Sequence, residues 1–159
     1  MIYGLAIFLF YGCSRTATLI SNGKSDYKIF VSAKAIAPEQ YAARMLQAYL
    51  YRISGCRLEI THEAGGHEKL ICLGFRDIPA NIVKRLDTAG FGNEAYIIRS
   101  DGKSLLIAGG GTRGTLYGVI GYLSDYLGCR WYTPEVKKIP AHPVVTLSVM
   151  EDRRKPAFS

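Results

Sequence analysis

Long runs of like charge are missing from this sequence, although its formal net charge is +7. The densest basic run is Arg153-Arg154-Lys155, and no block of five or six Lys or Arg residues occurs. Nucleic-acid-binding domains usually gather their basic residues on one face or along one helix. The scattered cations therefore predict a mildly basic, solvated surface and no nucleic-acid partner.

Metal-binding and redox spacings are missing as well. None of the four cysteines lies in a C-x-x-C pattern, which would indicate a zinc site or a redox pair. His62 and His67 resemble the histidines of a zinc-protease signature, but those lie four residues apart on one helix face. Histidines five apart are rotated by roughly 140° on a helix. The segment is predicted to be a polar turn, without a metal or cofactor.

Catalytic constellations are equally scarce. Glycosidases hold two carboxylates about 5 to 9.5 Å apart across a cleft. The thirteen Asp and Glu residues here fall mostly in turns or on solvent-facing helix positions, and no Ser/His/Asp or Cys/His arrangement stands out. The chain by itself is therefore predicted to be non-catalytic.

The first twelve residues, MIYGLAIFLFYG, are an apolar run that differs from the rest of the chain. Such a run is too short to span a bilayer but is typical of a signal peptide. Gly12-Cys13 resembles a bacterial lipobox, so we expect cleavage before Cys13, lipidation of its thiol and a tether over residues 13–18. The protein would then be exported and held in the periplasm or at the outer membrane. The alternative is a buried N-terminal strand with an incidental cysteine.

The 159 residues suffice for one domain, which we place at residues 19–150. A helix is predicted over residues 38–55, with Pro38 in its first turn and Gly55 as its stop, and a second over residues 112–127. A shorter helical element is expected at residues 80–86. Strands are expected at residues 18–21, 27–31, 58–61, 69–73, 93–109 (a hairpin around Asp101-Gly102), 129–132 and 144–149. This order predicts an α+β fold, with one mixed, largely antiparallel sheet packed on two main helices.

The glycines around the second helix allow two interpretations. Gly109, Gly111 and Gly114 match the dinucleotide-binding pattern G-x-G-x-x-G, and Glu135 follows at the distance of a ribose-binding carboxylate. That pattern normally opens a domain, because a parallel half-sheet must follow it. Gly114, Gly118 and Gly121 instead share one helix face, which indicates close packing against a sheet or a second domain. We interpret the glycines as structural and keep a dinucleotide-binding domain as the alternative.

Thr112 is expected to cap the N-terminus of the second helix.

Three segments together resemble a known family: AARMLQAYLYRISG, GGGTRGTLYGVIGYLSDYLGCRWYTP and the KKIP that follows. They are similar to the N-terminal domain of family 67 glycoside hydrolases, the α-glucuronidases, and more closely still to a group of bacterial secreted proteins. A similar accessory domain precedes the catalytic barrel in family 20 β-hexosaminidases. The resemblance implies a zincin-like shape without metal, a catalytic barrel in the same chain, and residues 151–159 as the start of the linker to it.

The resemblance also implies where a saccharide could bind. Trp131 and Tyr132 lie near the expected domain boundary, and aromatic faces stack on sugar rings. Arg130, beside the two rings, could hydrogen-bond the carboxylate of a uronic acid. Arg113, from its position at the start of the second helix, could reach a carboxylate or a sugar hydroxyl. The alternative for the two rings is packing in the core or at a domain interface. The predicted function is a non-catalytic accessory domain of an exported carbohydrate-active enzyme; a stand-alone glycan- or protein-binding module is the alternative.

Overall fold

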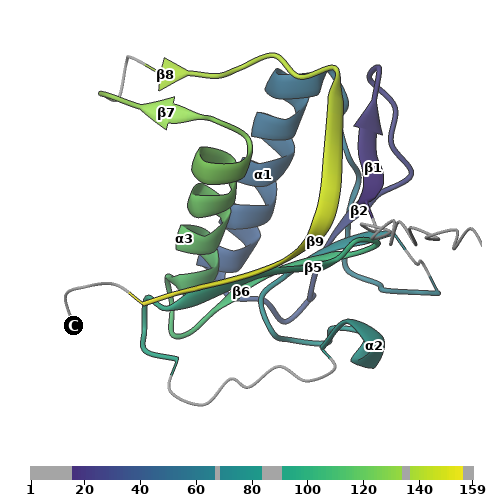
Figure 1. Cartoon of the computed structure of the whole chain (residues 1–159). Coiled ribbons are helices and arrows are strands. Elements are labelled where there is room, and N and C mark those ends of the chain that lie inside the picture. The colour runs from purple at the N-terminus through teal and green to yellow at the C-terminus, as the bar shows by residue number, and fades with distance from the viewer. Residues whose placement is uncertain (1–15, 67–68, 84–90, 134–136, 156–159) are drawn as a thin grey trace, which may run out of the picture.

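The computed structural model describes residues 16–66, 69–83, 91–133 and 137–155 (Figure 1). The predicted signal peptide, Cys13, His67 and Glu135 lie outside these ranges. The elements in chain order are β1 (Thr16–Ser21), β2 (Lys28–Val31), α1 (Ala37–Ser54), β3 (Ile60–Thr61), β4 (Leu70–Leu73), α2 (Ala80–Val83), β5 (Tyr96–Asp101), β6 (Leu105–Gly109), α3 (Gly114–Gly121), the π-helix η1 (Tyr122–Tyr126), β7 (Arg130–Trp131), β8 (Lys137–Lys138) and β9 (Val144–Arg154).

Seven strands form one mixed sheet in the order β1-β9-β5-β6-β4-β2-β3. The pairings from β1 to β6 are antiparallel, and those from β6 through β4 and β2 to β3 are parallel. The predicted α+β fold with a mixed sheet is confirmed, but parallel pairs make up a larger share than expected. The reason is that α1 connects β2 to its parallel neighbour β3, as a crossover helix does.

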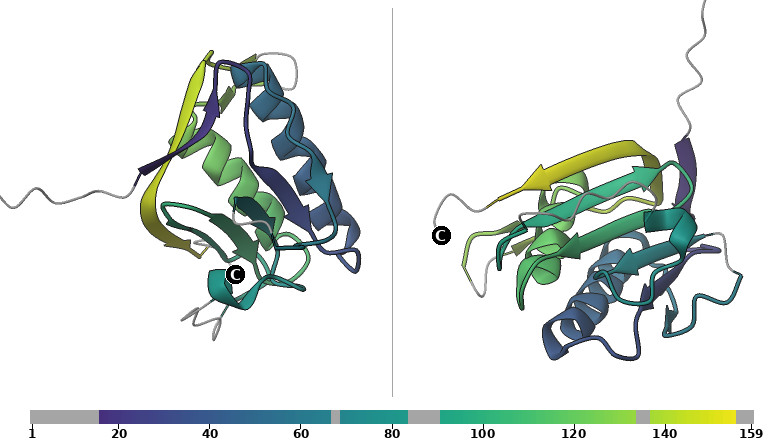
Figure 2. Two further views of the ribbon diagram at one scale, coloured as in Figure 1. Left: turned by 90° about the vertical axis from the view of Figure 1, so that its right-hand side faces the viewer. Right: turned by 90° about the horizontal axis from the view of Figure 1, so that it is seen from below.

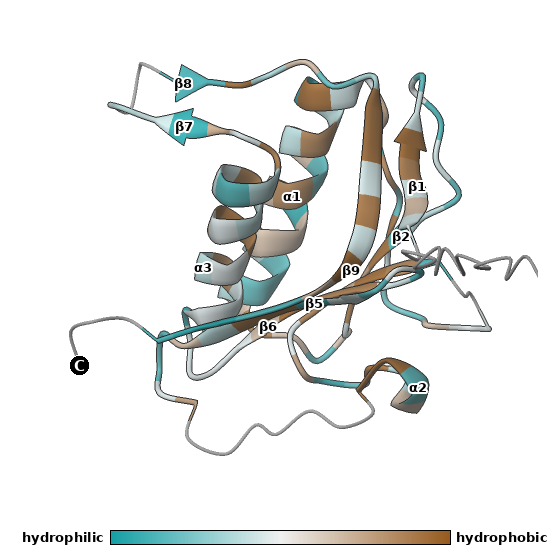
Figure 3. Ribbon diagram, viewed as in Figure 1, coloured by the Kyte–Doolittle hydropathy of each residue, from teal (hydrophilic) through white to brown (hydrophobic). Residues whose placement is uncertain are grey.

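The two long helices lie side by side on one face of this sheet (Figures 1 and 2). Between them and the sheet is a core that includes Leu46, Leu50, Ile107 and Leu123, each fully or almost fully buried. The opposite face is covered by the segment around α2, whose apolar side chains pack on Phe30 and neighbouring residues. Figure 3 shows the hydrophobic strands that both layers cover. None of the helices in the described ranges is long and apolar enough to cross a membrane.

Helix α1 and the β5–β6 hairpin form where the sequence predicts them. Pro38 lies in the first turn of α1, and Gly55 after it has φ of 74°, a left-handed conformation that favours glycine. In the hairpin, Oδ1 of Asp101 accepts hydrogen bonds from the backbone N–H groups of Lys103 (2.8 Å) and Ser104 (2.7 Å). These local signals are sufficient to determine where α1 begins and ends and where the β5–β6 hairpin turns.

The segment before α3 shows why its glycines are needed. The N–H of Gly110 donates to the carbonyl of Ala95 at 2.8 Å, and a Cβ on Gly111 would lie 2.6 Å from Cα of Asn93. A Cβ on Gly114 would lie 2.5 Å from the carbonyl oxygen of Ala95. Protein backbone thus fills the space beside this loop, which supports the structural interpretation of the glycines.

The start of α3 differs from the prediction. The expected cap at Thr112 is wrong, because the N-cap position is Arg113 and no side chain bonds there. Gly110 and Gly111 pack closely against the segment around Asn93, so the turn extends past Thr112 and the helix begins only at Gly114. The second prediction about this helix is confirmed: Gly118 faces the sheet, where a Cβ would lie 2.7 Å from Cγ2 of Ile107.

Two predicted boundaries fall inside strands. β1 begins at Thr16, within the predicted tether, and β9 continues to Arg154, beyond the predicted end of the domain at residue 150. The Asn22-Gly23 turn forms, but the strands on either side of it do not pair with each other. β1 pairs with β9, whereas β2 pairs with β3 and β4.

Candidate functional site

A hollow of about 720 Å³ lies between the outer face of α1 and the two-stranded ribbon β7–β8. We call it the ribbon hollow. Its lining residues come from two parts of the chain: Tyr41, Arg44, Met45, Ala48, Tyr49 and Arg52 of α1, and Trp131, Tyr132, Thr133 and Lys137 of the ribbon region. Most ligand pockets have volumes of roughly 300–1,000 Å³. The ribbon hollow is therefore large enough for a ligand or for side chains of a partner.

Trp131 anchors the ribbon on α1. Its indole Nε1 donates a hydrogen bond to the hydroxyl of Tyr49 at 2.7 Å, and the two ring centroids are 5.5 Å apart. The guanidinium of Arg52 lies 5.7 Å from the centroid of the Tyr49 ring on the same side of the helix. A tilted aromatic pair with a satisfied indole N–H is a stable contact. The aromatic wall of the hollow is thus fixed in place.

The lining of the hollow is positively charged. Arg44, Arg52 and Lys137 contribute cations, and no acidic residue lines it within the described ranges. The one acidic residue of α1, Glu39, is 5% exposed and accepts hydrogen bonds from Arg76 (2.8 Å) and the N–H of Ile36 (3.1 Å) at the helix start. The solvent face of α1 therefore carries arginine and tyrosine without any neutralising carboxylate.

The structure brings two of the four predicted saccharide-binding residues together. Trp131 and Tyr132 both line the ribbon hollow, and the Tyr132 side chain is exposed. Arg113 is exposed at the start of α3, at the end of that helix away from the ribbon (Figure 1). Arg130 points elsewhere: its Nη1 donates to the carbonyls of Ser124 and, at 2.8 Å, Cys129. Saccharide binding at these residues stays a prediction.

Sequence reasoning missed the contribution of α1 to this site. Tyr41, Arg44 and Arg52 belong to the helix face opposite its buried stripe, and no role was predicted for that face from the sequence. One signal was present in the sequence, namely that the exposed face of the helix contains arginine and tyrosine but no acidic residue. Aromatic residues, Met and Arg are enriched at interfaces, and Lys, Glu and Asp are depleted.

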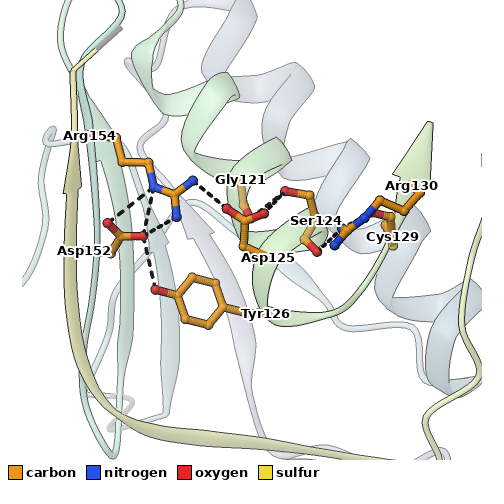
Figure 4. Close-up of polar contacts among 8 residues, drawn as sticks. All are labelled: Gly121, Ser124, Asp125, Tyr126, Cys129, Arg130, Asp152 and Arg154. Carbon is orange, nitrogen blue, oxygen red and sulfur yellow. Dashed lines mark hydrogen bonds and ion pairs between the residues drawn. The ribbon is translucent and has the colours of Figure 1, made fainter. Parts of the chain in front are cut away.

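A polar network lies beside the ribbon (Figure 4). Arg154, at the end of β9, contacts Oδ2 of Asp125 through Nη1 at 2.6 Å and Oδ2 of Asp152 through Nη2 at 2.9 Å. The hydroxyl of Ser124 lies 2.7 Å from Oδ1 of Asp125. The hydrogen bond from Ser124, followed by that from Arg154, lowers the pKa of Asp125. Asp125 is thus held as a carboxylate.

Within the described residues, no group of three or more His, Cys, Asp or Glu side chains could hold a metal ion. His62 bonds through Nδ1 with the carbonyl of Val31 at 2.9 Å, and His67 lies outside the described ranges. Cys56, Cys72 and Cys129 are buried free thiols. Burial raises the pKa of Cys72 to about 12, which suppresses its thiolate.

Comparison with solved structures shows the same fold in longer proteins. A family GH115 4-O-methyl-α-glucuronidase, BtGH115A, matches with a TM-score of 0.59 and 15% identity over 88% of this chain and 18% of that one. The GH20 β-N-acetylhexosaminidase of Streptomyces coelicolor A3(2) matches with a TM-score of 0.57 and 18% identity over 90% and 24%. The GH20 exo-β-N-acetylglucosaminidase of Vibrio harveyi gives 0.51 and 12% over 90% and 17%. The chain therefore spans less than a quarter of each of these enzymes.

Comparison of the sequence gives the family. Curated proteins yield no match. The family model described as the glycosyl hydrolase family 67 N-terminus matches residues 15–122, which is more than half of the chain and contains α1, the glycine loop and α3. The predicted resemblance is confirmed, and the chain belongs to the family of glycosyl hydrolase family 67 N-terminal domains.

Proposed function

We propose that this chain is a non-catalytic accessory domain of an exported glycoside hydrolase, packed against a catalytic domain of the same protein. The observation that carries the proposal is that this fold is a minor part of longer glycoside hydrolases, 18% of BtGH115A and 24% of the Streptomyces coelicolor enzyme. The parent enzyme would act on a polysaccharide that carries uronic acids or amino sugars. The accessory domain would support the catalytic one.

The ribbon hollow is the surface that we assign to this contact. Tyr41 is 53% exposed and Tyr132 is 66% exposed, although both are large aromatic side chains. Arg44 and Arg52 lie beside them without an ion pair to any described residue. Tyrosine and arginine are the residue types that dominate binding energy at the centre of protein interfaces. An acidic surface on the catalytic domain would complete the site.

The first test is the mass of the native polypeptide in its source cells. We expect a chain much heavier than 17.6 kDa, and a native mass near 17.6 kDa would contradict the proposal that the domain is part of an enzyme.

Tyrosine labelling then locates the contact. Tyr41 and Tyr132 should be modified readily in the 159-residue chain and be protected in the longer protein. Equal modification of both tyrosines in both proteins would contradict docking at the hollow.

We infer further that the protein is a lipoprotein anchored through Cys13, as the apolar segment and the Gly12-Cys13 pair indicate. Mass spectrometry of the native N-terminal peptide should show an acylated Cys13 as the first residue. Replacing it (Cys13→Ala) should release the protein from membranes. A native N-terminus at Met1 without lipid would refute the anchor.

A second candidate function is glycan binding in the same hollow, which its aromatic rings and three cations favour. An acidic oligosaccharide such as hexagalacturonate would stack on Tyr132 and pair with Arg44 or Arg52. Titration of the fluorescence of Trp131, the only tryptophan, would detect such binding. Tyr132→Ala should weaken binding. Tyr51→Ala should not, because Tyr51 is an exposed tyrosine of α1 that does not line the hollow. A response to neutral xylohexaose of the same size would contradict recognition of charge.

A further inference from the structure

The π-helix η1 contacts two other segments, which are the first strand of the β7–β8 ribbon and the end of β9 (Figure 4). The N–H of Leu127 bonds to the carbonyl of Tyr122, five residues earlier, at 3.3 Å. Tyr122 is buried, whereas Asp125 and Tyr126 are exposed. Such π-turns are rare and often occur at functional positions. Here the turn places the Asp125 carboxylate against Arg154 of β9 and the hydroxyl of Ser124.

On one side, η1 is bonded to the end of β9. The guanidinium of Arg154 spans Asp125 of η1 and Asp152 of its own strand through Nη1 and Nη2. Nε of Arg154 also lies 3.1 Å from Oδ2 of Asp152, and the hydroxyl of Tyr126 donates to the same oxygen at 3.3 Å. A planar guanidinium that bridges two carboxylates fixes direction as well as distance. The last described strand is thus tied to the turn by several bonds.

On the other side, η1 is bonded to the ribbon. Nη1 of Arg130, the first residue of β7, donates to the carbonyl of Ser124. The hydroxyl of Ser124 lies within hydrogen-bonding distance of Asp125 and, at 3.1 Å, of the carbonyl of Gly121. Ser124 therefore belongs to both halves of the network. Trp131 follows Arg130 directly and carries the wall of the ribbon hollow.

We propose that Asp125 and Arg154 are positioning residues that hold the β7–β8 ribbon in a fixed orientation relative to the end of β9. The inference rests on the proposed function, because the ribbon carries the docking surface and β9 leads toward the catalytic domain. The same network then orients both connections to the catalytic domain: the covalent one through β9 and the non-covalent one through the ribbon hollow. Loss of either charge leaves the fold intact but loosens the ribbon.

Amide hydrogen exchange on the 159-residue chain tests this inference, with Trp131 fluorescence as a second signal. Asp125→Asn and Arg154→Gln should each raise exchange at the hydrogen-bonded amides of the β7–β8 ribbon by roughly two- to five-fold, which is the range of partly exposed ion pairs. Exchange in the β4 core should not change. The conservative variant Arg154→Lys should recover part of the protection.

The control is Asp26→Asn, which removes the exposed pair of Asp26 with Lys69 and should leave the ribbon unaffected. Ribbon exchange equal to wild type in both network variants would overturn the proposal. A uniform rise throughout the chain would also overturn it, because that result indicates general destabilisation. Both results concern this chain alone, so they are separate from the native mass that tests the proposed function.

Discussion

Replacing Gly118 by alanine measures how closely α3 approaches the sheet. The substitution adds about 1 kcal/mol of helix propensity. The new Cβ, however, would lie 2.7 Å from Cγ2 of Ile107 and 3.4 Å from the ring of Tyr96. Ile107 is fully buried in the centre of the sheet and cannot move aside. Because overpacking of this kind costs roughly 1–3 kcal/mol and the gain in helix propensity offsets about 1 kcal/mol of it, we expect a net loss of up to about 2 kcal/mol in the free energy of unfolding.

Urea unfolding followed by Trp131 fluorescence gives the magnitude, and the melting temperature should fall by up to roughly 8 °C. A matched control is Gly92→Ala, since a Cβ there meets nothing within 4 Å. The double variant Gly118→Ala with Ile107→Leu, which removes the Cγ2 methyl at constant volume, should recover part of the loss. A stabilised Gly118→Ala variant would refute the close contact and with it the structural interpretation of the glycine stripe.

Three further predictions concern single side chains. Glu39→Ala should lower the free energy of unfolding by about 2–3 kcal/mol in urea titrations, because it leaves the N–H of Ile36 unpaired, whereas the exposed Glu59→Ala should have little effect. Cys72, with its pKa raised to about 12, should resist iodoacetamide at pH 9 and react only on unfolding; labelling of the native protein would contradict its burial. The pKa of Asp125 is lower in the folded chain than in the unfolded chain. The stabilisation that its carboxylate contributes is therefore complete above the unfolded pKa and is lost as the pH falls through the folded pKa. Acid titrations should consequently destabilise the wild type more than Asp125→Asn.

The sequence was sufficient where the determinants are local. Pro38 and Gly55 bound α1, and Asp101-Gly102 directs the hairpin, because each acts on the backbone within a few residues. The spacing of Gly114, Gly118 and Gly121 also predicted close packing, since the periodicity of a helix places them on one face. The family could be predicted because motifs separated along the chain agree with one another.

Long-range features could not be predicted in the same way. Tyr41 and Arg44 line a hollow only because the ribbon around Trp131, some 90 residues later, folds over α1. The π-turn that directs Arg130 toward the carbonyl of Ser124 has no sequence signature, so Arg130 was predicted to bind a ligand instead. The parallel pairings of β2, β4 and β6 depend on crossover connections rather than on alternating hydrophobicity.

The pairing of β1 with β9 has a consequence for synthesis. Thr16 is opposite Ser148, so the first described strand finds its partner only after almost the whole domain has been made. β9 then enters between β1 and β5 and completes the sheet. Until that moment β1 and β5 both present unpaired edges, which are sites of aggregation, and such distant pairing slows folding. A nascent chain that stops short of Val144 cannot pair β1 with β5 through β9, so the seven-stranded sheet described here depends on β9.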